Sequence, residues 1–446
     1  MRVIFFLMNY PGNIGLISPL VNTMDDAGIE VTIVNYWCST IFPFSELIGL
    51  KGNYLTISDG GVGTIPPLSR RQYHQLCHDD IDFVKCQSHV YVAEGYPKAP
   101  HFLDTDSLYY RRFRGIAYRI GEMLKACRPD YVIVHQGSEP VSKMCYSKCT
   151  KLGIPALLWE TPFFPGRILL DSVGMHFFRG QNMIDRDWEE VRQRALTPDQ
   201  RARLGRYIAR WMSGRVSKYV QPCDGYEMQD LLKWKPVNSR LLFIPGQVPH
   251  DANLVTGLDI FDSCEEMLDY VHAHLPDGWV MAYKPHPKDE SNCLRSGVLS
   301  GKAYVVKNAS IHSLIEAADV VMTFSSNVGL EALIYGKPVI CCGRPHYGAK
   351  GLTVDIESRA DFPEVLKTAV NFTVDRELLD RFLYYVIFDY LIEPGDTETV
   401  IERLNDARVH FPHETIPDPF CDNYPTRLQS YLDIIYEYEK HAKEAA

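Results

Sequence analysis

The sequence predicts an α/β protein with two Rossmann-like domains, an inter-domain cleft and C-terminal helices. Three observations support this fold class. The 446 residues suffice for two or three domains of about 150 residues each. Apolar residues make up 46% and charged residues 23%, as in ordinary globular proteins with a large core. Both halves alternate β-rich apolar runs with helical patterns, which is typical of parallel sheets covered by helices.

The first half opens with an apolar run that breaks at a loop containing Pro11 and Gly12, followed by a helical pattern and a second apolar run. We expect strands at 2–8, 30–36, 130–135 and 153–160, and helices at 15–27, 107–127 and 139–152. Residues 38–105 are rich in polar and aromatic residues, so we expect loops and short helices there. We place the first domain at 1–225.

A charged helical stretch, 182–219, ends the first half. Within it, Thr197 and Pro198 form a helix start, with Thr197 as N-cap and proline at the first helical position. The following segment, 201–219, is basic and has apolar residues at helical spacing. Such a helix either packs on its own domain with a solvated face or lies on an anionic membrane.

The second half repeats the alternation more regularly, and we place the second domain at 226–390. The expected strands are 241–244, 279–283, 303–306, 320–324 and 338–342, and the expected helices are 257–274, 289–299, 310–318 and 328–336. The sequence of the remaining segment, 391–446, predicts helices that cross back to the first domain, with a closing helix at 426–443. Ligands of both domains are expected at the carboxyl ends of the strands.

Composition and charge exclude several classes of protein. With 46 basic and 56 acidic residues, the net charge is -10, which argues against a dedicated nucleic-acid binder.

None of the 12 cysteines stands in a CxxC pair, which favours reduced thiols in a cytoplasmic protein. The short run 1–8 lacks the features of a signal peptide, and no run approaches ~20 apolar residues. No metal motif is visible. We therefore expect a cytoplasmic protein, at most peripheral at the inner face of the membrane.

Polar residues that could bind a ligand or take part in catalysis follow three of the predicted strands in the second half. Gln247, His250 and Asp251 share one loop. His286 stands between two prolines that restrict the backbone, beside Lys284 and Lys288, and this cluster suits a phosphate. At the third strand end, Ser325 and Ser326 precede a helix, and hydroxyls at a helix N-terminus form an anion site. Glu331 follows one turn later, where its carboxylate could accept hydrogen bonds from ribose hydroxyls.

Each segment also has a purely structural interpretation. Ser325, Ser326 or Asn327 could be an N-cap, the Pro-His-Pro segment a rigid turn, and Asp251 a cap of the chain that follows. A fourth segment, 345–353, could be a surface loop or a loop that closes over the same site. A common ligand is favoured because the first three segments lie at strand ends of one domain.

These segments in order resemble the bacterial capsule polysaccharide biosynthesis family, which includes retaining β-Kdo glycosyltransferases. The resemblance spans about 130–355 and includes 159–166 and Ser217-Lys218-Tyr219 in the first half. It implies a GT-B fold and a CMP-β-Kdo donor, with no cofactor or metal. It also implies retention, with Asp251 as nucleophile and Glu160 as the acid/base or acceptor-activating residue. The donor-binding residues it implies are Gln247, Lys284, His286, Pro287, Ser325, Ser326, Asn327, Gly329, Glu331, Tyr347 and Lys350.

One departure from the family pattern follows Glu160. Thr161 and Pro162 stand where capsule members have an acidic residue and a glycine, which leaves the acceptor open. The expected partners are a nucleotide-sugar donor and a glycan or lipid-linked glycan acceptor, with no nucleic acid. Three alternatives remain: a GT-B transferase with another nucleotide-sugar donor, with or without inversion, a nonhydrolysing sugar-nucleotide epimerase, and a non-catalytic binding protein.

Overall fold

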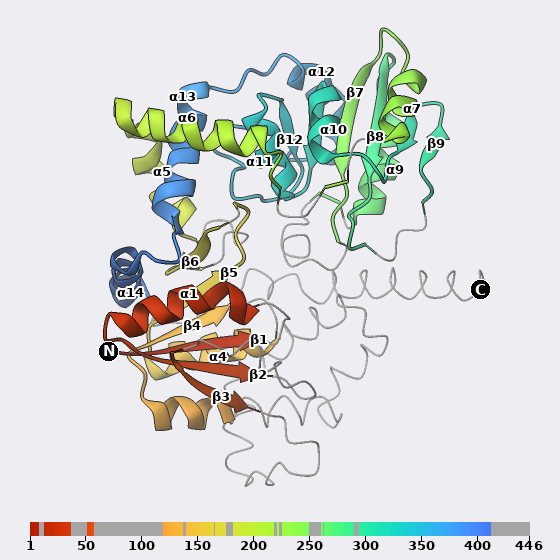
Figure 1. The fold of residues 1–446 in the computed structure, drawn as a ribbon. Coiled ribbons are helices and arrows are strands. Elements are labelled where there is room, and N and C mark those ends of the chain that lie inside the picture. Colours follow the sequence, from red (N-terminus) through yellow and green to blue (C-terminus); the bar gives the residue numbers. More distant parts are fainter. Residues whose placement is uncertain are drawn as a thin grey trace, which may run out of the picture.

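The computed structural model describes residues 1–8, 13–36, 51–57, 119–136, 140–164, 166–174, 182–217, 221–222, 225–248, 260–261, 263–289 and 294–411. The described chain forms two α/β halves, each built around a seven-stranded sheet (Figure 1). Parallel strands flanked by helices dominate both sheets, which confirms the predicted fold class of two Rossmann-like units. The boundaries 1–225, 226–390 and 391–446 stay a prediction.

The first sheet has the order β14-β6-β5-β4-β1-β2-β3. Its strands are β1 (Arg2–Met8), β2 (Glu30–Tyr36), β3 (Asn53–Ile57), β4 (Tyr131–His135), β5 (Ala156–Glu160), β6 (Ile168–Asp171) and β14 (Leu391–Ile392). The strands from β3 to β5 are parallel, whereas β6 and β14 are antiparallel to their neighbours. Every residue of β4 and β5 is buried, because helices cover both faces of a parallel sheet.

Helices on the two faces of the first sheet explain why its strands read as continuous apolar runs. Apolar residues of α1 (Asn13–Asp26) and α14 (Thr397–His410) pack in one cluster with one face of the sheet. Residues 119–127, which are helical, and α4 (Pro140–Leu152) pack against the other face. The predicted helices 15–27 and 139–152 are thus confirmed within two residues. Residues 53–57, predicted as loops and short helices, instead form the edge strand β3.

The second sheet has the order β13-β12-β11-β7-β8-β10-β9. Its strands are β7 (Arg240–Pro245), β8 (Trp279–Lys284), β9 (Gly297–Ser300), β10 (Ala303–Val305), β11 (Val320–Thr323), β12 (Val339–Cys341) and β13 (Val354–Asp355). Its helices are α7 (Tyr226–Trp234), α9 (Cys264–His274), α10 (Ile311–Ala317), α11 (Asn327–Ile334) and α12 (Phe362–Ala369), with a short η3 (Arg359–Asp361) before α12. All five predicted strands are present.

Two helix predictions in the second half need correction. The predicted helix at 289–299 is wrong at its described end, because residues 297–300 form β9, which pairs antiparallel with β10 at the sheet edge. The helix predicted from residue 257 has its start at Cys264 in α9, where the Ser263 side chain accepts a hydrogen bond from the backbone N–H of Glu266. That hydroxyl satisfies one of the otherwise unpaired N–H groups of the first turn.

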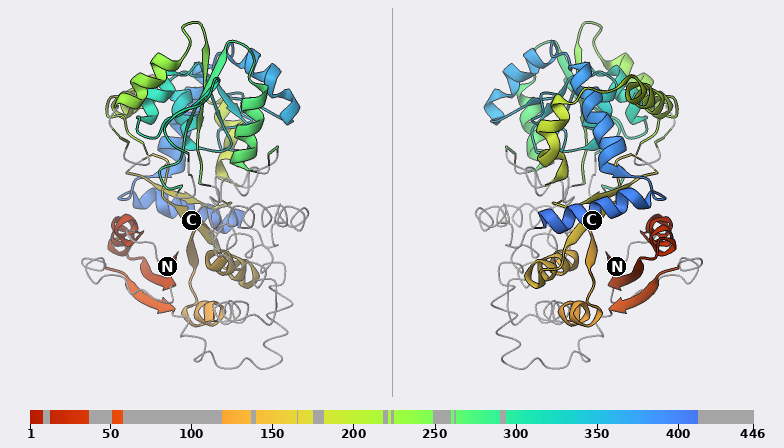
Figure 2. Two further views of the ribbon diagram at one scale, coloured as in Figure 1. Left: turned by 90° about the vertical axis from the view of Figure 1, so that its right-hand side faces the viewer. Right: turned by 90° about the vertical axis from the view of Figure 1, so that its left-hand side faces the viewer.

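The described C-terminal segment runs from the second half back to the first, as Figure 2 shows for the blue helices. Helix α13 (Arg376–Tyr384) continues into the π-helical η4 (Tyr385–Tyr390). Strand β14 then adds to the first sheet beside β6, and α14 follows. A buried carboxylate, Asp171 of β6, accepts a hydrogen bond of 3.0 Å from the Tyr390 hydroxyl. The predicted closing helix at 426–443 lies outside the described residues.

Helices α5 (Met183–Gln193) and α6 (Pro198–Ser213) connect the halves. The predicted helix start is confirmed, because Thr197 caps α6 in a reciprocal capping box with Gln200. The helix ends at Ser213 instead of continuing to residue 219. Its apolar stripe is buried, so α6 packs within the protein and exposes a basic face. Within the described ranges, no helix is both long and apolar enough to cross a membrane.

Candidate functional site

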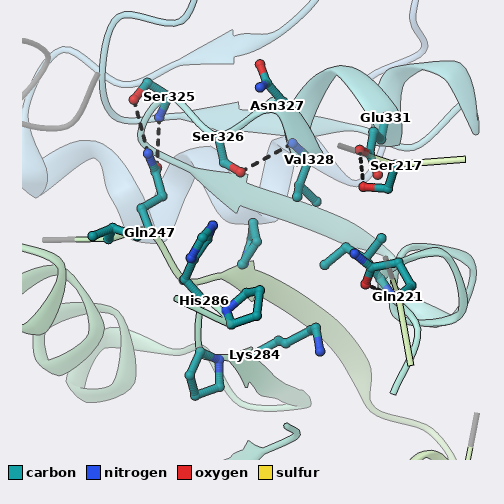
Figure 3. Close-up of a pocket in the computed structure, with 16 residues that line it drawn as sticks. Ser217, Gln221, Gln247, Lys284, His286, Ser325, Ser326, Asn327, Val328 and Glu331 are labelled. Carbon is teal, nitrogen blue, oxygen red and sulfur yellow. Dashed lines mark hydrogen bonds between the residues drawn. The ribbon is translucent and has the colours of Figure 1, made fainter. Parts of the chain in front are cut away.

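A pocket lies at the carboxyl edge of the second sheet, where β7, β8 and β11 end (Figure 3). We call it the strand-end pocket. It is lined by Ser217, Gln221, Pro245, Gly246, Gln247, Val248, Lys284, Pro285, His286, Pro287, Ile311, Ser325, Ser326, Asn327, Val328 and Glu331. Three of the four segments that the sequence indicates as candidate ligand-binding segments therefore meet in one place, as expected for loops that follow neighbouring parallel strands.

The loop after β7 is fixed by a close backbone approach. Gly246 donates a hydrogen bond of 2.7 Å from its backbone N–H to the Lys284 carbonyl. A Cβ atom at this position would lie 2.8 Å from the backbone nitrogen of His286 and 2.9 Å from the Lys284 carbonyl oxygen. Both contacts are shorter than van der Waals distances, so only glycine fits here. The absence of a side chain at Gly246 thus sets the position of His286.

Gln247 joins the ends of β7 and β11. Its amide nitrogen donates to the Ser325 hydroxyl at 3.2 Å, and its amide oxygen accepts from the Ser325 backbone N–H at 3.1 Å (Figure 3). Both residues are buried. The predicted donor-binding residue Gln247 therefore lines the pocket, and its amide also holds the loop that carries the serines.

His286 is held by the backbone of its own turn. The Lys288 N–H donates a hydrogen bond of 3.1 Å to Nδ1 of the ring. Because Nδ1 acts as an acceptor, the proton of the neutral ring is on Nε2. The two flanking residues, Pro285 and Pro287, also line the pocket. His286 is thereby prepared to donate a hydrogen bond from Nε2, which suits a phosphate oxygen.

Lys284, the last residue of β8, stands two positions before this histidine. Its ammonium donates 2.7 Å to the Lys307 carbonyl, and burial lowers its pKa, with Glu227 opposing that effect. Glu227 in turn accepts hydrogen bonds from the backbone N–H groups of Lys307 and Asn308 at 2.8 and 2.9 Å. Lys284 therefore lines the pocket and also holds the 307–308 turn beside it.

The serines after β11 begin helix α11. Ser326 is its N-cap, and its hydroxyl accepts a hydrogen bond of 3.3 Å from the Val328 N–H. The structural interpretation thus holds for Ser326, which nevertheless lines the pocket together with Ser325 and Asn327. The start of α11 faces the pocket in Figure 3. Its partial positive charge and backbone N–H groups favour an anion at this place.

Glu331 lies one turn further along α11 and is a buried acid. Its Oε1 accepts a hydrogen bond of 2.9 Å from the Ser217 hydroxyl, and among the described residues its Oε2 has no hydrogen-bond partner. Burial raises the pKa of Glu331 to about 8, although Ser217 opposes the shift. The carboxyl group is therefore mostly protonated at neutral pH, with one oxygen available to a ligand hydroxyl.

Gly329 and Tyr347 form the support beneath this helix. A Cβ atom at Gly329 would lie 2.1 Å from the Tyr347 hydroxyl oxygen, so the ring packs against bare backbone. That hydroxyl donates 2.5 Å to the Ser326 carbonyl, and burial raises the pKa of Tyr347 well above its ordinary value. Neither residue lines the strand-end pocket as the structure describes it. Both act on the pocket through the start of α11.

Lys350 also has a partner away from the strand-end pocket. Its ammonium donates to Oδ1 of Asp185, at the start of α5, and lies 5.8 Å from the centre of the Trp188 ring. The ion pair is buried, with 4% of the Lys350 side chain and 15% of the Asp185 side chain exposed. The predicted donor-binding residues Tyr347 and Lys350 therefore have structural partners here, and Lys350 ties the 345–353 segment to α5.

Of the two predicted catalytic residues, the structure describes only Glu160, which does not line the strand-end pocket. Glu160 ends β5 in the first sheet, is 7% exposed, and accepts a hydrogen bond of 3.1 Å from the Gln136 amide. Phe163, three residues later, stacks on His346 of the second half with ring centres 4.4 Å apart. Glu160 thus precedes a segment that touches the second half. Asp251 lies outside the described residues.

Gln221 lines the strand-end pocket and was missed by sequence reasoning. Its amide oxygen accepts a hydrogen bond of 3.2 Å from the Ile311 N–H at the start of α10. No local signal could have identified it, because its partner is 90 residues away and it follows no predicted strand. Among the described residues, no group of three or more His, Cys, Asp or Glu side chains could hold a metal ion.

Comparison with known proteins gives consistent matches. The family model described as capsule polysaccharide biosynthesis protein matches residues 181–390. Capsule polysaccharide modification protein LipA of Neisseria meningitidis serogroup B (strain ATCC BAA-335 / MC58) is 33% identical over 122 residues, which are 26% of this chain and 17% of LipA. Lipopolysaccharide-processing protein LpsZ of Rhizobium meliloti is 30% identical over 138 residues, 28% of this chain and 29% of LpsZ. The matches thus span less than a third of these curated relatives.

A solved structure with a similar fold is the Thermosulfurimonas dismutans KpsC, beta Kdo 2,4 transferase. It is 20% identical, covers 61% of this chain and 86% of its own, and has a TM-score of 0.45. The family model and the sequence matches agree with the resemblance drawn from the strand-end motifs. The match to the capsule polysaccharide biosynthesis family model, residues 181–390, contains all the residues that line the strand-end pocket.

Proposed function

We propose that the chain is a glycosyltransferase of bacterial surface polysaccharide synthesis, and that its nucleotide-sugar donor binds in the strand-end pocket. The observation that carries this proposal is the convergence of a tautomer-fixed histidine, a serine-capped helix N-terminus and a buried acid at one sheet edge. These groups match the chemistry of a nucleotide. The phosphate oxygens of the donor accept hydrogen bonds from His286 and from the backbone N–H groups at the start of α11. The carboxyl group of Glu331 forms hydrogen bonds with the ribose hydroxyls.

The proposed donor is CMP-β-Kdo, and the proposed acceptor is a glycan or a lipid-linked glycan. The match of residues 181–390 to the capsule polysaccharide biosynthesis family model supports this donor, because the family resemblance implies it. A nucleoside monophosphate leaves as an anion, so its departure needs cationic and dipolar stabilisation more than a strong acid. His286 and the α11 N-terminus offer this at the pocket, and no cofactor or metal is required.

Retention through a covalent intermediate is the proposed mechanism. The Asp251 carboxylate attacks the anomeric carbon, the bond from that carbon to the CMP oxygen breaks, and the nucleotide leaves with the bonding pair. An acceptor hydroxyl then attacks the same carbon, Asp251 is released, and the hydroxyl proton passes to Glu160. Asp251 stands four positions after Gln247, a residue of the pocket.

A mass-spectrometric trapping experiment tests this function. The protein is incubated with CMP-Kdo without acceptor, digested and searched for a Kdo-sized adduct on the Asp251 peptide, with Glu160→Gln included to slow the second step. We expect the adduct in wild type or in Glu160→Gln, and none in Asp251→Asn. Absence of the adduct together with product of inverted configuration would contradict retention. Isomerised nucleotide sugar without acceptor would indicate an epimerase.

Peripheral contact with a membrane through α6 is part of the proposal. Its apolar stripe is buried, so the contact would be electrostatic, through exposed side chains such as Arg206 and Arg210. We expect wild type to sediment with anionic liposomes at low salt and an Arg203/Arg206/Arg210 charge-removal variant to sediment less. Equal sedimentation of the two would refute the contact.

A further inference from the structure

Gln136, the residue after β4, has a backbone conformation that residues with side chains rarely adopt. Its φ angle is 51°, in the left-handed region. Glycine occupies this region without steric cost, whereas a glutamine does so under strain. Strained backbone of this kind collects at functional sites, where the surrounding structure holds it in place. The side chain of Gln136 should therefore contribute something that glycine would not.

The contacts of Gln136 show what that contribution is. Its backbone N–H donates 2.8 Å to the Trp159 carbonyl, which extends the pairing of β4 with β5 by one residue. Its side-chain amide donates 3.1 Å to Oε1 of Glu160, the last residue of β5. The left-handed turn thus places the amide beside a carboxyl group that is 7% exposed.

We propose that Gln136 is a positioning residue for Glu160 and that its strained backbone serves to aim the amide at the Glu160 carboxylate. This inference rests on the proposed function, in which Glu160 takes the acceptor proton. A hydrogen bond donated to a carboxylate favours its charged form, so the amide supports the role of Glu160 as a base. It also fixes the orientation of the carboxylate at the edge of the first sheet.

The turn that precedes β4 provides a matched control. Arg128, three residues before β4, has a φ of 44° and lies exposed at the opposite end of the strand. Its backbone N–H donates 2.9 Å to the Leu124 carbonyl, as at the end of a helix. Gln136→Gly and Arg128→Gly therefore relieve the same kind of strain on the two sides of β4, and only Gln136→Gly removes a contact to Glu160.

The experiment compares thermal stability and the pH profile of kcat for wild type, Gln136→Gly, Arg128→Gly and Glu160→Gln, with nucleotide-sugar donor and acceptor glycan. We expect both glycine variants to melt at or above the wild-type temperature. In Gln136→Gly, kcat should fall about ten-fold with the donor KM unchanged, and the acidic limb of the profile should move to higher pH. Arg128→Gly should keep the wild-type profile.

The outcomes separate the inference from the proposed function. If Glu160→Gln is inactive but Gln136→Gly keeps the wild-type kcat and pH profile, the positioning role is refuted. If Glu160→Gln keeps full activity, the proposed role of Glu160 is refuted. If no variant has transferase activity, the Glu160 carboxyl is titrated by infrared difference spectroscopy, with Glu160→Gln as blank. An unchanged Glu160 pKa in Gln136→Gly would then overturn the inference.

Discussion

Replacing Glu331 with glutamine should make the protein more stable at neutral and alkaline pH. Burial raises the pKa of Glu331 to about 8 from an ordinary value of 4.5, because the charged form loses its hydration on α11. Glutamine has the same shape, can still accept the hydrogen bond from Ser217, and never bears a charge. The substitution therefore removes the cost of the buried acid without opening a cavity.

The size of the effect follows from the two pKa values. Below pH 4.5, Glu331 is protonated in both the folded and unfolded states, so its contribution to stability is fully present. As the pH rises, the unfolded state loses this proton while the folded state keeps it, which costs about 1.4 kcal/mol per pH unit. The loss reaches about 3 kcal/mol at pH 7 and levels off above pH 8 at about 5 kcal/mol.

Urea unfolding of wild type and Glu331→Gln between pH 5 and pH 9 measures this difference. We expect similar stabilities at pH 5, and an advantage for Glu331→Gln that grows to pH 8 and then stays constant. An exposed acid, Glu364 on α12, gives the control Glu364→Gln, which should show no such pH trend. A difference between wild type and Glu331→Gln that is flat over the whole range would refute the buried, protonated acid.

Three further substitutions test the support of the strand-end pocket. Gly329→Ala places a methyl group 2.1 Å from the Tyr347 hydroxyl oxygen, so thermal unfolding should show a loss of stability of about 3 kcal/mol. Calorimetry should show weaker nucleotide binding by the same variant. The control Gly121→Ala, which has no atom within 4 Å of the added methyl group, should leave both unchanged. Gly246→Ala should push His286 out of place and weaken nucleotide binding about ten-fold; unchanged affinity would contradict the close approach seen here. Lys350→Met leaves a buried Asp185 carboxylate and should cost about 3 kcal/mol in urea unfolding, while no loss would show that the ion pair is dispensable.

The elements that the sequence predicts well are those with covered faces. Strands such as β4 and β5 are buried at every residue, so they read as apolar runs between helices. The elements that escaped prediction lie near sheet edges or are very short. β9, where the sequence predicts helix, has two exposed residues in its middle. β14 has only two residues and pairs with a strand more than 200 residues away.

The site shows the same division between local and distant information. Turn chemistry and strand ends indicated Gln247, His286 and Ser325, and the structure brings them together. The roles of Tyr347 and Lys350 depend on partners in other segments, Gly329 of α11 and Asp185 of α5, which no local pattern encodes. The strained backbone of Gln136 is equally invisible in sequence, because glutamine gives no signal for a left-handed conformation.

Nucleotide binding by isothermal titration calorimetry is the most direct test of the central claim, that the strand-end pocket holds the nucleotide of a sugar donor. CMP, UMP and GMP are titrated into wild type and into His286→Ala, with Arg128→Gly as a folded control. We predict saturable binding of CMP to wild type, in preference to the other two, with affinity lowered at least ten-fold in His286→Ala and unchanged in the control. Binding of none of the three nucleotides, or CMP binding that His286→Ala leaves intact, would contradict the account.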